Sequence, residues 1–175
     1  GSHASRAILF DATGTEVAHA HVPVATRRSG DDRVEQDAEE LVRSLRTAVD
    51  DAIDASGHAS ISAAGLATQR STIVAWSRAS GRPLTDAISW QDRRNAAWLT
   101  RLAPVVQRVR EITGLPLSPH YGASKMRWCL DHLPAVQAAQ ASGDLVMGPL
   151  ASFLACRLLE GGRDRCLRAA DEDAA

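Results

Sequence analysis

The feature that most constrains the fold is a change in hydrophobic period along the chain. Short apolar runs at residues 7–10, 17–24, 61–68 and 72–76 have the length and composition of β-strands. The run at 61–68 is almost continuous, which is typical of a strand buried on both faces. Residues 37–57 instead repeat apolar side chains at the helical period, and helical segments dominate the second half of the chain. The pattern predicts an α/β or α+β domain.

Residues 37–57 carry the clearest helix signals. Asp37 is an N-cap residue with Glu40 three positions later, the arrangement of a capping box. Gly57 stands where a left-handed residue is expected after the last turn. The apolar side chains that form one face are Leu41, Leu45, Ala48, Val49, Ala52 and Ile53. The preceding runs at 7–10 and 17–24 are separated by a turn at Gly14, which predicts a hairpin.

The second half is predicted to contain one short strand and three helices. The strand covers residues 87–90. The first helix has an apolar side from Ala97 to Val109 and ends before Gly114. The others cover 124–133, where a proline follows, and 150–159, where two glycines follow.

Charge and cysteine usage exclude several classes of protein. The 175 residues have a net charge of −1, which argues against nucleic acid or an anionic membrane as partner. No apolar run reaches the ~18 to 20 residues that cross a bilayer. Cys129, Cys156 and Cys166 are odd in number and widely spaced, and the histidines lack metal-ligand spacing. This usage favours thiols in a reducing cytoplasm and predicts no metal site.

Several segments resemble, in the same order, motifs of the FGGY family of carbohydrate kinases. The segments are SRAILFD at 5–11, VEQD at 34–37, QRST at 69–72, AISWQDRR at 87–94, TGLP at 113–116, SKMRW at 124–128 and GPLASFLACRLLEGG at 148–162. Each motif is weak alone, but their order and spacing are specific. Within the family they resemble the glycerol kinase branch.

The resemblance implies an actin-like, ribonuclease-H-like ATPase fold made of two such domains. Residues 1–175 are then expected to be a partial N-terminal domain that lacks its first strand, with the C-terminal domain absent. The implied function is transfer of the γ-phosphate of ATP to a hydroxyl of a polyol or sugar, with ATP and Mg²⁺ as cofactors of the complete enzyme.

No residue of this chain matches the family's catalytic base, an aspartate well beyond the matched region. The acidic residues 171–173 are interpreted as a solvated tail. The chain alone is therefore expected to be inactive. Its expected partners are a small polyol or sugar and the missing kinase domain. An exposed sheet edge would also allow copies of the chain to associate.

The nucleotide-binding positions implied by the resemblance are Ser2, His3 and Arg6. They match the end of the family's phosphate-binding turn, in which backbone amides and hydroxyls hold phosphate oxygens. His3 and the following Ala4 depart from the hydroxyl-rich pattern of that turn. Gly-Ser-His is also a common remnant of an expression tag, and that interpretation stays open.

Arg70 and Ser71 occupy the positions of an arginine and a glutamate that bind vicinal hydroxyls of the substrate in the family. A guanidinium is suited to this because its planar fork addresses two oxygens at once. A surface ion pair is the alternative role for Arg70. Serine in place of glutamate removes a carboxylate acceptor, so the substrate need not be glycerol.

Trp90 matches a tryptophan that packs on the carbon face of the substrate. Asp92 follows in the same motif, either as a substrate contact or as a helix cap and structural ion pair. His120 falls where a substrate-contacting tyrosine is expected, and a one-residue slip would put Tyr121 there. A loop histidine and a core tyrosine are the alternatives. Lys125 is expected to be architectural.

Two other functions remain open. The chain could be a non-catalytic carbohydrate- or partner-binding module derived from the kinase fold, which the loss of the glutamate at Ser71 would suit. It could also be an unrelated α/β domain whose motif matches are accidental. Polyol binding without nucleotide binding would favour the module.

Overall fold

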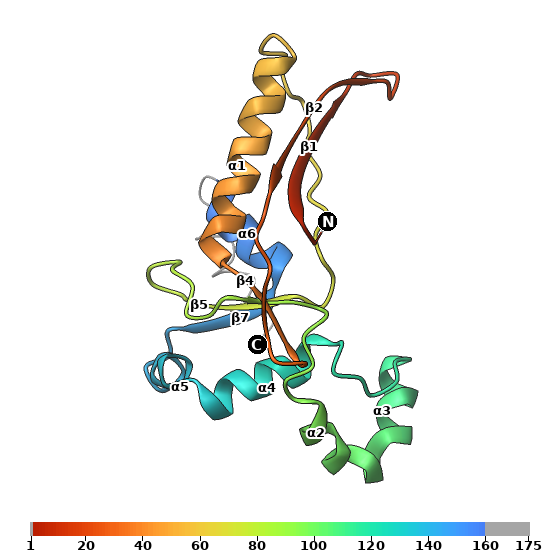
Figure 1. The fold of residues 1–175 in the computed structure, drawn as a ribbon, viewed down its shortest axis with the longest axis vertical. Coiled ribbons are helices and arrows are strands. Elements are labelled where there is room, and N and C mark those ends of the chain that lie inside the picture. The colour runs from red at the N-terminus through yellow and green to blue at the C-terminus, as the bar shows by residue number, and fades with distance from the viewer. Residues whose placement is uncertain (1, 160–175) are drawn as a thin grey trace.

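The computed structural model describes residues 2–159, and its fold is shown in Figure 1. The strands are β1 (Ala4–Phe10), β2 (Glu16–Pro23), β3 (Arg27–Ser29), β4 (Arg33–Gln36), β5 (Ile73–Ser77), β6 (Ala87–Ile88) and β7 (Leu145–Pro149). The helices are α1 (Ala38–Ala55), α2 (Ala96–Leu99), the 3₁₀ helix η1 (Thr100–Val105), α3 (Val106–Thr113), α4 (Gly122–His132), α5 (Pro134–Ala141) and α6 (Leu150–Leu158). The mixture of helices and sheets confirms the predicted α/β class.

The main core is built on a five-stranded sheet with strand order β3-β4-β6-β5-β7. Strand β5 lies within this sheet, antiparallel to β6 and to β7, and all five of its residues are buried. Val74 and Trp76 belong to a core cluster shared with α1 and α6, whereas Ile73 and Ala75 belong to one shared with α4 and α5. The sheet is therefore covered on both faces, as Figure 1 shows.

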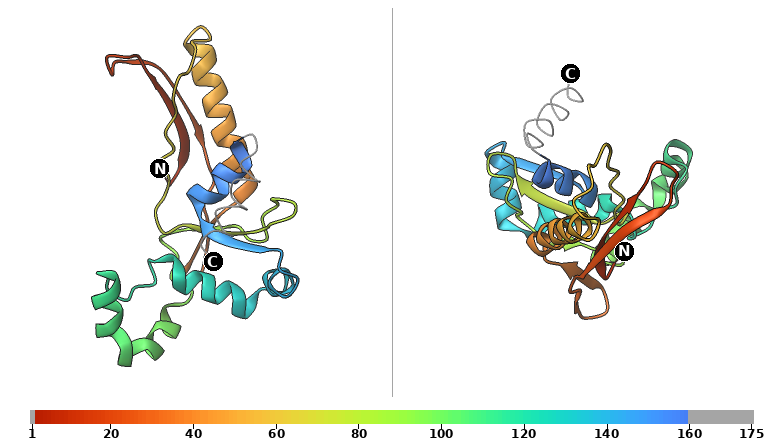
Figure 2. Two further views of the ribbon diagram at one scale, coloured as in Figure 1. Left: turned by 180° about the vertical axis from the view of Figure 1, so that it is seen from behind. Right: turned by 90° about the horizontal axis from the view of Figure 1, so that it is seen from above.

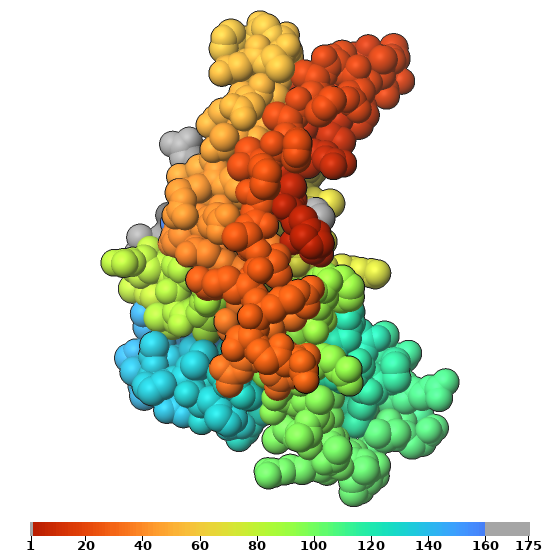
Figure 3. All heavy atoms as spheres, in the orientation of Figure 1, coloured from red at the N-terminus to blue at the C-terminus, as the bar shows by residue number. Residues whose placement is uncertain are grey.

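The β1–β2 hairpin forms a second sheet, which is covered on one face only. Alternate residues of β1 face α1, and the Ser5 hydroxyl lies 2.8 Å from that of Ser44 on the helix. The other face carries Ile8 and Phe10, which are 40% and 60% exposed. Viewed from above, the hairpin lies along one side of α1, and the space-filling view shows both extending away from the rest of the molecule (Figures 2 and 3). The predicted hairpin is confirmed.

The predicted N-cap at Asp37 and the left-handed glycine after helix α1 are confirmed, whereas the predicted capping box is not formed. Asp37 Oδ1 accepts a hydrogen bond of 2.8 Å from the Glu40 amide. The Glu40 side chain does not complete a capping box, because its Oε1 accepts from the amide of Ala25 at 3.1 Å instead. Gly57 has φ of +71°, the left-handed conformation expected after the helix.

The prediction of a buried strand at residues 61–68 is wrong. The segment forms no helix or strand, and residues 61–67 are exposed, including Ile61 at 49% and Leu66 at 46%. Within residues 2–159 no strand pairs with it. The apolar composition is that of a buried strand, but the described structure provides neither a partner strand nor a covering layer.

The prediction of one continuous helix from Ala97 to Val109 is also wrong. The region is divided into α2, η1 and α3, with Pro104 inside the 3₁₀ segment. Proline has no N–H to donate and disturbs an α-helix at this place. None of the three helices contains a buried residue, so tertiary packing does not compensate for the break.

Helices α4 and α6 and strand β6 lie where the sequence predicts them. The glycines expected to stop α6, at 161 and 162, and the acidic residues 171–173 lie outside the described residues. Among the helices of the described region, none is long and apolar enough to cross a bilayer.

Candidate functional site

The turn that enters β5 holds two of the predicted site residues. Ser71 has φ of +64°, which is rare for a residue with a side chain and redirects the chain between Arg70 and the buried Thr72. Thr72 secures the turn, because its Oγ1 accepts from the Trp90 amide at 3.0 Å and donates to Gln69 Oε1 at 3.1 Å. Arg70 is exposed, and no hydrogen bond or ion pair engages its side chain within residues 2–159.

Trp90 brings three other predicted residues together. Its indole Nε1 donates to the Ser2 hydroxyl at 3.1 Å. Its ring meets the His120 ring edge to face, with centroids 5.5 Å apart, and His120 meets Tyr121 in the same way at 5.2 Å. All four side chains are half-buried, so each keeps exposed surface that a ligand could contact.

Gln36 is a part of this region that the sequence reasoning missed. It is 1% exposed, and its amide joins two segments that are far apart in the sequence. Oε1 accepts from Gln69 Nε2 at 2.7 Å, and Nε2 donates to the Ser2 carbonyl at 2.9 Å. Its place in the VEQD segment was the only signal of its importance. The amide fixes the N-terminal segment against the turn at residues 69–72.

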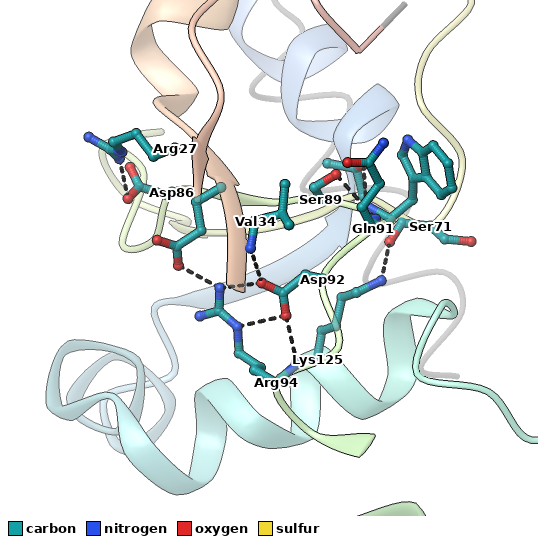
Figure 4. A network of polar contacts seen from close by, with 12 residues as sticks. Arg27, Val34, Ser71, Asp86, Ser89, Gln91, Asp92, Arg94 and Lys125 are labelled. Atoms are coloured by element: carbon teal, nitrogen blue, oxygen red, sulfur yellow. Dashed lines mark hydrogen bonds and ion pairs between the residues drawn. The ribbon is translucent and has the colours of Figure 1, made fainter. Parts of the chain in front are cut away.

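Asp92 lies beneath the site in a buried polar network, shown in Figure 4. It is 0% exposed, and its carboxylate accepts from the Val34 amide at 2.8 Å and from Arg94 Nε and Nη2 at 2.8 and 2.7 Å. Arg94 also donates to Glu35 at 2.7 Å. Burial lowers the pKa of Arg94, but the hydrogen bonds to Asp92 and Glu35 outweigh it and raise the pKa above its usual value. This geometry favours the structural alternative for Asp92.

Lys125 on α4 connects the two loops of the site. It is 1% exposed, and its ammonium donates to the carbonyls of Ser71 at 3.1 Å and His120 at 2.5 Å. Figure 4 shows the side chain extending from α4 toward Ser71. The expected architectural role of Lys125 agrees with this position, although the sequence did not indicate which groups it would join.

The three predicted nucleotide-binding residues lie at the start of the hairpin. Together with Ala4 they line a surface hollow of about 260 Å³, and its lining residues are Ser2, His3, Ala4 and Arg6. His3 and Arg6 are exposed, so two nitrogen-bearing side chains face solvent there. Ser2 also reaches the Trp90 indole, which places the hollow beside the aromatic residues.

Of the predicted site residues, Ser2, Trp90, His120 and Tyr121 are joined by direct contacts, and Ser71 is linked to His120 through Lys125. Asp92 is buried in the polar network, and within residues 2–159 no hydrogen bond or ion pair joins the side chain of Arg6 or Arg70 to these residues. Among residues 2–159 no group of three or more His, Cys, Asp or Glu side chains is placed to hold a metal ion. The region offers exposed guanidinium, hydroxyl and aromatic groups. These can bind an uncharged polyhydroxy ligand through hydrogen bonds and through the C–H faces of its carbons.

Comparison with known proteins gives a consistent family. The model of the FGGY family of carbohydrate kinases, N-terminal domain, matches residues 1–162. A glycerol kinase of Rhodospirillum rubrum is 41% identical over 92% of this chain and 33% of its own length. One of Lactobacillus acidophilus is 34% identical over the same shares. The chain thus spans about a third of the length of these relatives.

Solved structures agree at the level of the fold. The structure of Plasmodium falciparum glycerol kinase with ADP has a TM-score of 0.84 and 21% identity, covering 90% of this chain and 32% of that one. A xylulose kinase from Rhodospirillum rubrum has a TM-score of 0.76 and 20% identity, covering 90% and 33%. These neighbours confirm the predicted actin-like fold.

Proposed function

Because this chain belongs to the FGGY family of carbohydrate kinases, we propose that it forms the acceptor-binding part of an ATP-dependent polyol or sugar kinase. The observation that carries the proposal is the agreement of two facts. Glycerol kinases are 33–41% identical over more than nine-tenths of the chain, and the residues of the substrate motif gather at one place in the fold. Residues 1–175 are proposed to be part of an N-terminal kinase domain, whose partner is a C-terminal domain.

The acceptor is proposed to bind between Trp90 and the turn at Ser71. The Trp90 ring would pack against carbon-bound hydrogens, and His120 or Tyr121 would hydrogen-bond a hydroxyl. Arg70 has no side-chain partner within the described residues, so its guanidinium is available for two neighbouring hydroxyls. Serine at position 71 supplies a hydroxyl where a carboxylate is the family pattern, which is compatible with an acceptor other than glycerol.

The phosphate groups of ATP are proposed to lie near Ser2, His3 and Arg6. ATP would supply the phosphoryl group, and the Arg6 guanidinium suits phosphate oxygens electrostatically. The Ser2 hydroxyl already contacts Trp90, so an acceptor against Trp90 and a phosphate at this hollow would be close together. The described residues contain no carboxylate cluster that fits Mg²⁺, and no metal-dependent step is assigned to them.

No residue of this chain is assigned as the general base that phosphoryl transfer to a hydroxyl requires. The chain's own role is to bind and orient the acceptor. A reducing cytoplasm is the proposed location, which suits the buried free thiols of Cys129 and Cys156.

The first test is acceptor binding by the purified chain labelled with 5-fluorotryptophan. Glycerol, a tetritol, a pentulose and a hexulose are titrated while the ¹⁹F spectrum is recorded. We expect one of them to shift the Trp90 signal, identified with Trp90→Phe, and to leave the Trp98 signal unchanged. Absence of any shift across the panel would contradict the proposal.

The second test is ADP release by the same chain with Mg-ATP and the same acceptors. We expect no release, because the chain has no assigned base. Acceptor-dependent release would mean that a complete catalytic centre lies within these 175 residues. If the chain binds an acceptor but binds no ATP, the result would instead support the non-catalytic binding module.

A further inference from the structure

Lys125 is an unusual residue in this chain. It is the single lysine of the sequence, and the other side chains that carry a permanent positive charge are arginines. Lys125 is 1% exposed. Burial of an ammonium is costly unless hydrogen bonds compensate for the lost water. The compensation here comes from backbone oxygens, the carbonyls of Ser71 and His120.

These two carbonyls belong to the two loops that carry the acceptor-binding residues. The Ser71 carbonyl follows the left-handed turn next to Arg70. The His120 carbonyl lies just before α4, in the loop where the His120 ring contacts Trp90 and Tyr121. One nitrogen atom therefore bridges the two loops. A non-glycine residue in the left-handed conformation is strained, and it persists when its surroundings hold it.

We propose that Lys125 is the positioning residue of the acceptor site, because its ammonium binds the carbonyls of Ser71 and His120 and so sets the separation of the two loops. This inference rests on the proposed function for its consequence, acceptor binding, but its geometry is independent of any ligand. Lysine suits the position because its compact ammonium on a flexible stem can reach two carbonyls, whereas the planar fork of arginine is larger and stiffer.

Protonation of Lys125 is expected to change these contacts. Burial lowers the pKa of Lys125 to about 8, with Asp92 opposing the shift and Arg94 adding to it. Other groups facing this region are Glu35, Cys129 and the His120 ring. Burial raises the pKa of the Cys129 thiol to about 11, so it stays neutral where Lys125 titrates. Hydrogen bonds from a neutral amine are weaker than those from an ammonium.

Loss of the proton from Lys125 should raise the free energy of unfolding and at the same time loosen the two loops of the site. The pKa of Lys125 in the folded state is below that of an exposed lysine, so the unfolded chain binds more protons between pH 8 and 10.5. This group's contribution to the free energy of unfolding therefore rises with pH in that range. The loops should become looser over the same range. A lysine with only a structural role would show the change in stability without the change in the loops of the site.

The test uses the complete chain labelled with 5-fluorotryptophan, without acceptor. In the unsubstituted protein we expect the Trp90 ¹⁹F signal to shift with a midpoint near pH 8, and the Trp76 signal to stay constant. Lys125→Met keeps the length of the side chain and removes the charge, and Lys125→Arg keeps a charge that does not titrate. Both should abolish the pH-dependent shift, and in Lys125→Met the Trp90 signal at pH 7 should resemble the high-pH signal of the unsubstituted protein.

The acceptor that binds in the titration above should bind about tenfold more weakly to Lys125→Met at pH 7, the effect of losing a charge-assisted hydrogen bond. Persistence of the Trp90 shift near pH 8 in Lys125→Arg or Lys125→Met would overturn the proposal, since His120 and all other titratable groups are retained there. If Lys125→Met fails to fold, Lys125→Arg decides. Because the ¹⁹F test needs no acceptor, it can succeed when acceptor binding, and with it the proposed function, fails.

Discussion

The five-stranded sheet and the β1–β2 hairpin differ in how they are covered. Each contains at least one short apolar strand, and each region holds one of the two phenylalanines of the chain. Phe153 in α6 packs against Trp76 and is 0% exposed, whereas Phe10 in the hairpin is 60% exposed. Helices cover both faces of the larger sheet, while only α1 covers the hairpin (Figures 1 and 2).

The difference shows where the stability of the described structure resides. Removal of apolar area from water is the main favourable contribution to folding, and it is concentrated in the five-stranded sheet and its helices. The hairpin and residues 61–67 keep the apolar composition of a core without the burial. The candidate site lies where these regions meet, but its hydrogen bonds through Thr72, Asp92 and Lys125 anchor it to the covered sheet.

The largest expected difference is between the two phenylalanines. Phe153→Ala should lower the free energy of unfolding by about 3–5 kcal/mol, because it leaves a cavity in a fully buried position. Phe10→Ala should change it by less than about 1 kcal/mol, as exposed substitutions do. Urea unfolding followed by tryptophan fluorescence measures both. Equal losses would show that the hairpin is as well packed as the covered sheet.

Removal of a buried charge partner should have the second largest effect on the free energy of unfolding. Asp92→Asn should cost about 3 kcal/mol, because it leaves the Arg94 guanidinium without its main partner in a buried place. The matched variant in the hairpin is Glu16→Gln, which breaks the exposed pair of Glu16 with His19 and should cost less than about 1 kcal/mol. Urea unfolding at pH 7 measures both variants. Similar losses of stability for the two substitutions would contradict the expected difference between the covered sheet and the hairpin.

Two glycines give a smaller contrast. A Cβ on Gly122 would lie 2.8 Å from Cγ2 of the buried Ile73, so Gly122→Ala should destabilise by about 1–3 kcal/mol. A Cβ on Gly65, in the uncovered segment, would have no heavy atom within 4 Å. Gly65→Ala should therefore be neutral or stabilise by a few tenths of a kcal/mol, on the order seen for compatible glycine replacements. A destabilising Gly65→Ala would indicate that residues 61–67 are packed in solution.

The sequence predicted the elements whose signals are local. The cap at Asp37 and the apolar period of α1, together with the glycine after it, depend on residues within a few positions of one another. Strands β3 and β4 were missed because RRS and RVEQ carry no strand signal of their own. Their pairing is determined by neighbours such as β6, which are far away in the sequence.

The site shows the same division. Trp90, His120 and Tyr121 were identified by resemblance to family motifs, and the structure brings their rings together. The contacts of Gln36 and of Lys125 could not be predicted, because buried polar contacts between distant segments leave no periodic signal and a motif does not name its partners. The strand predicted at 61–68 failed for the opposite reason. Its local signal is strong, but a strand also requires a partner.

Amide hydrogen exchange tests most directly whether the site is anchored on the covered sheet. The account predicts slow exchange for Val74 and Ala75 in β5 and for the Trp90 amide, which donates to Thr72. Residues 61–67, which pair with no strand of the described structure, should exchange nearly as fast as an unfolded peptide. Comparable protection of residues 61–67 and β5, or rapid exchange at Trp90, would contradict the account.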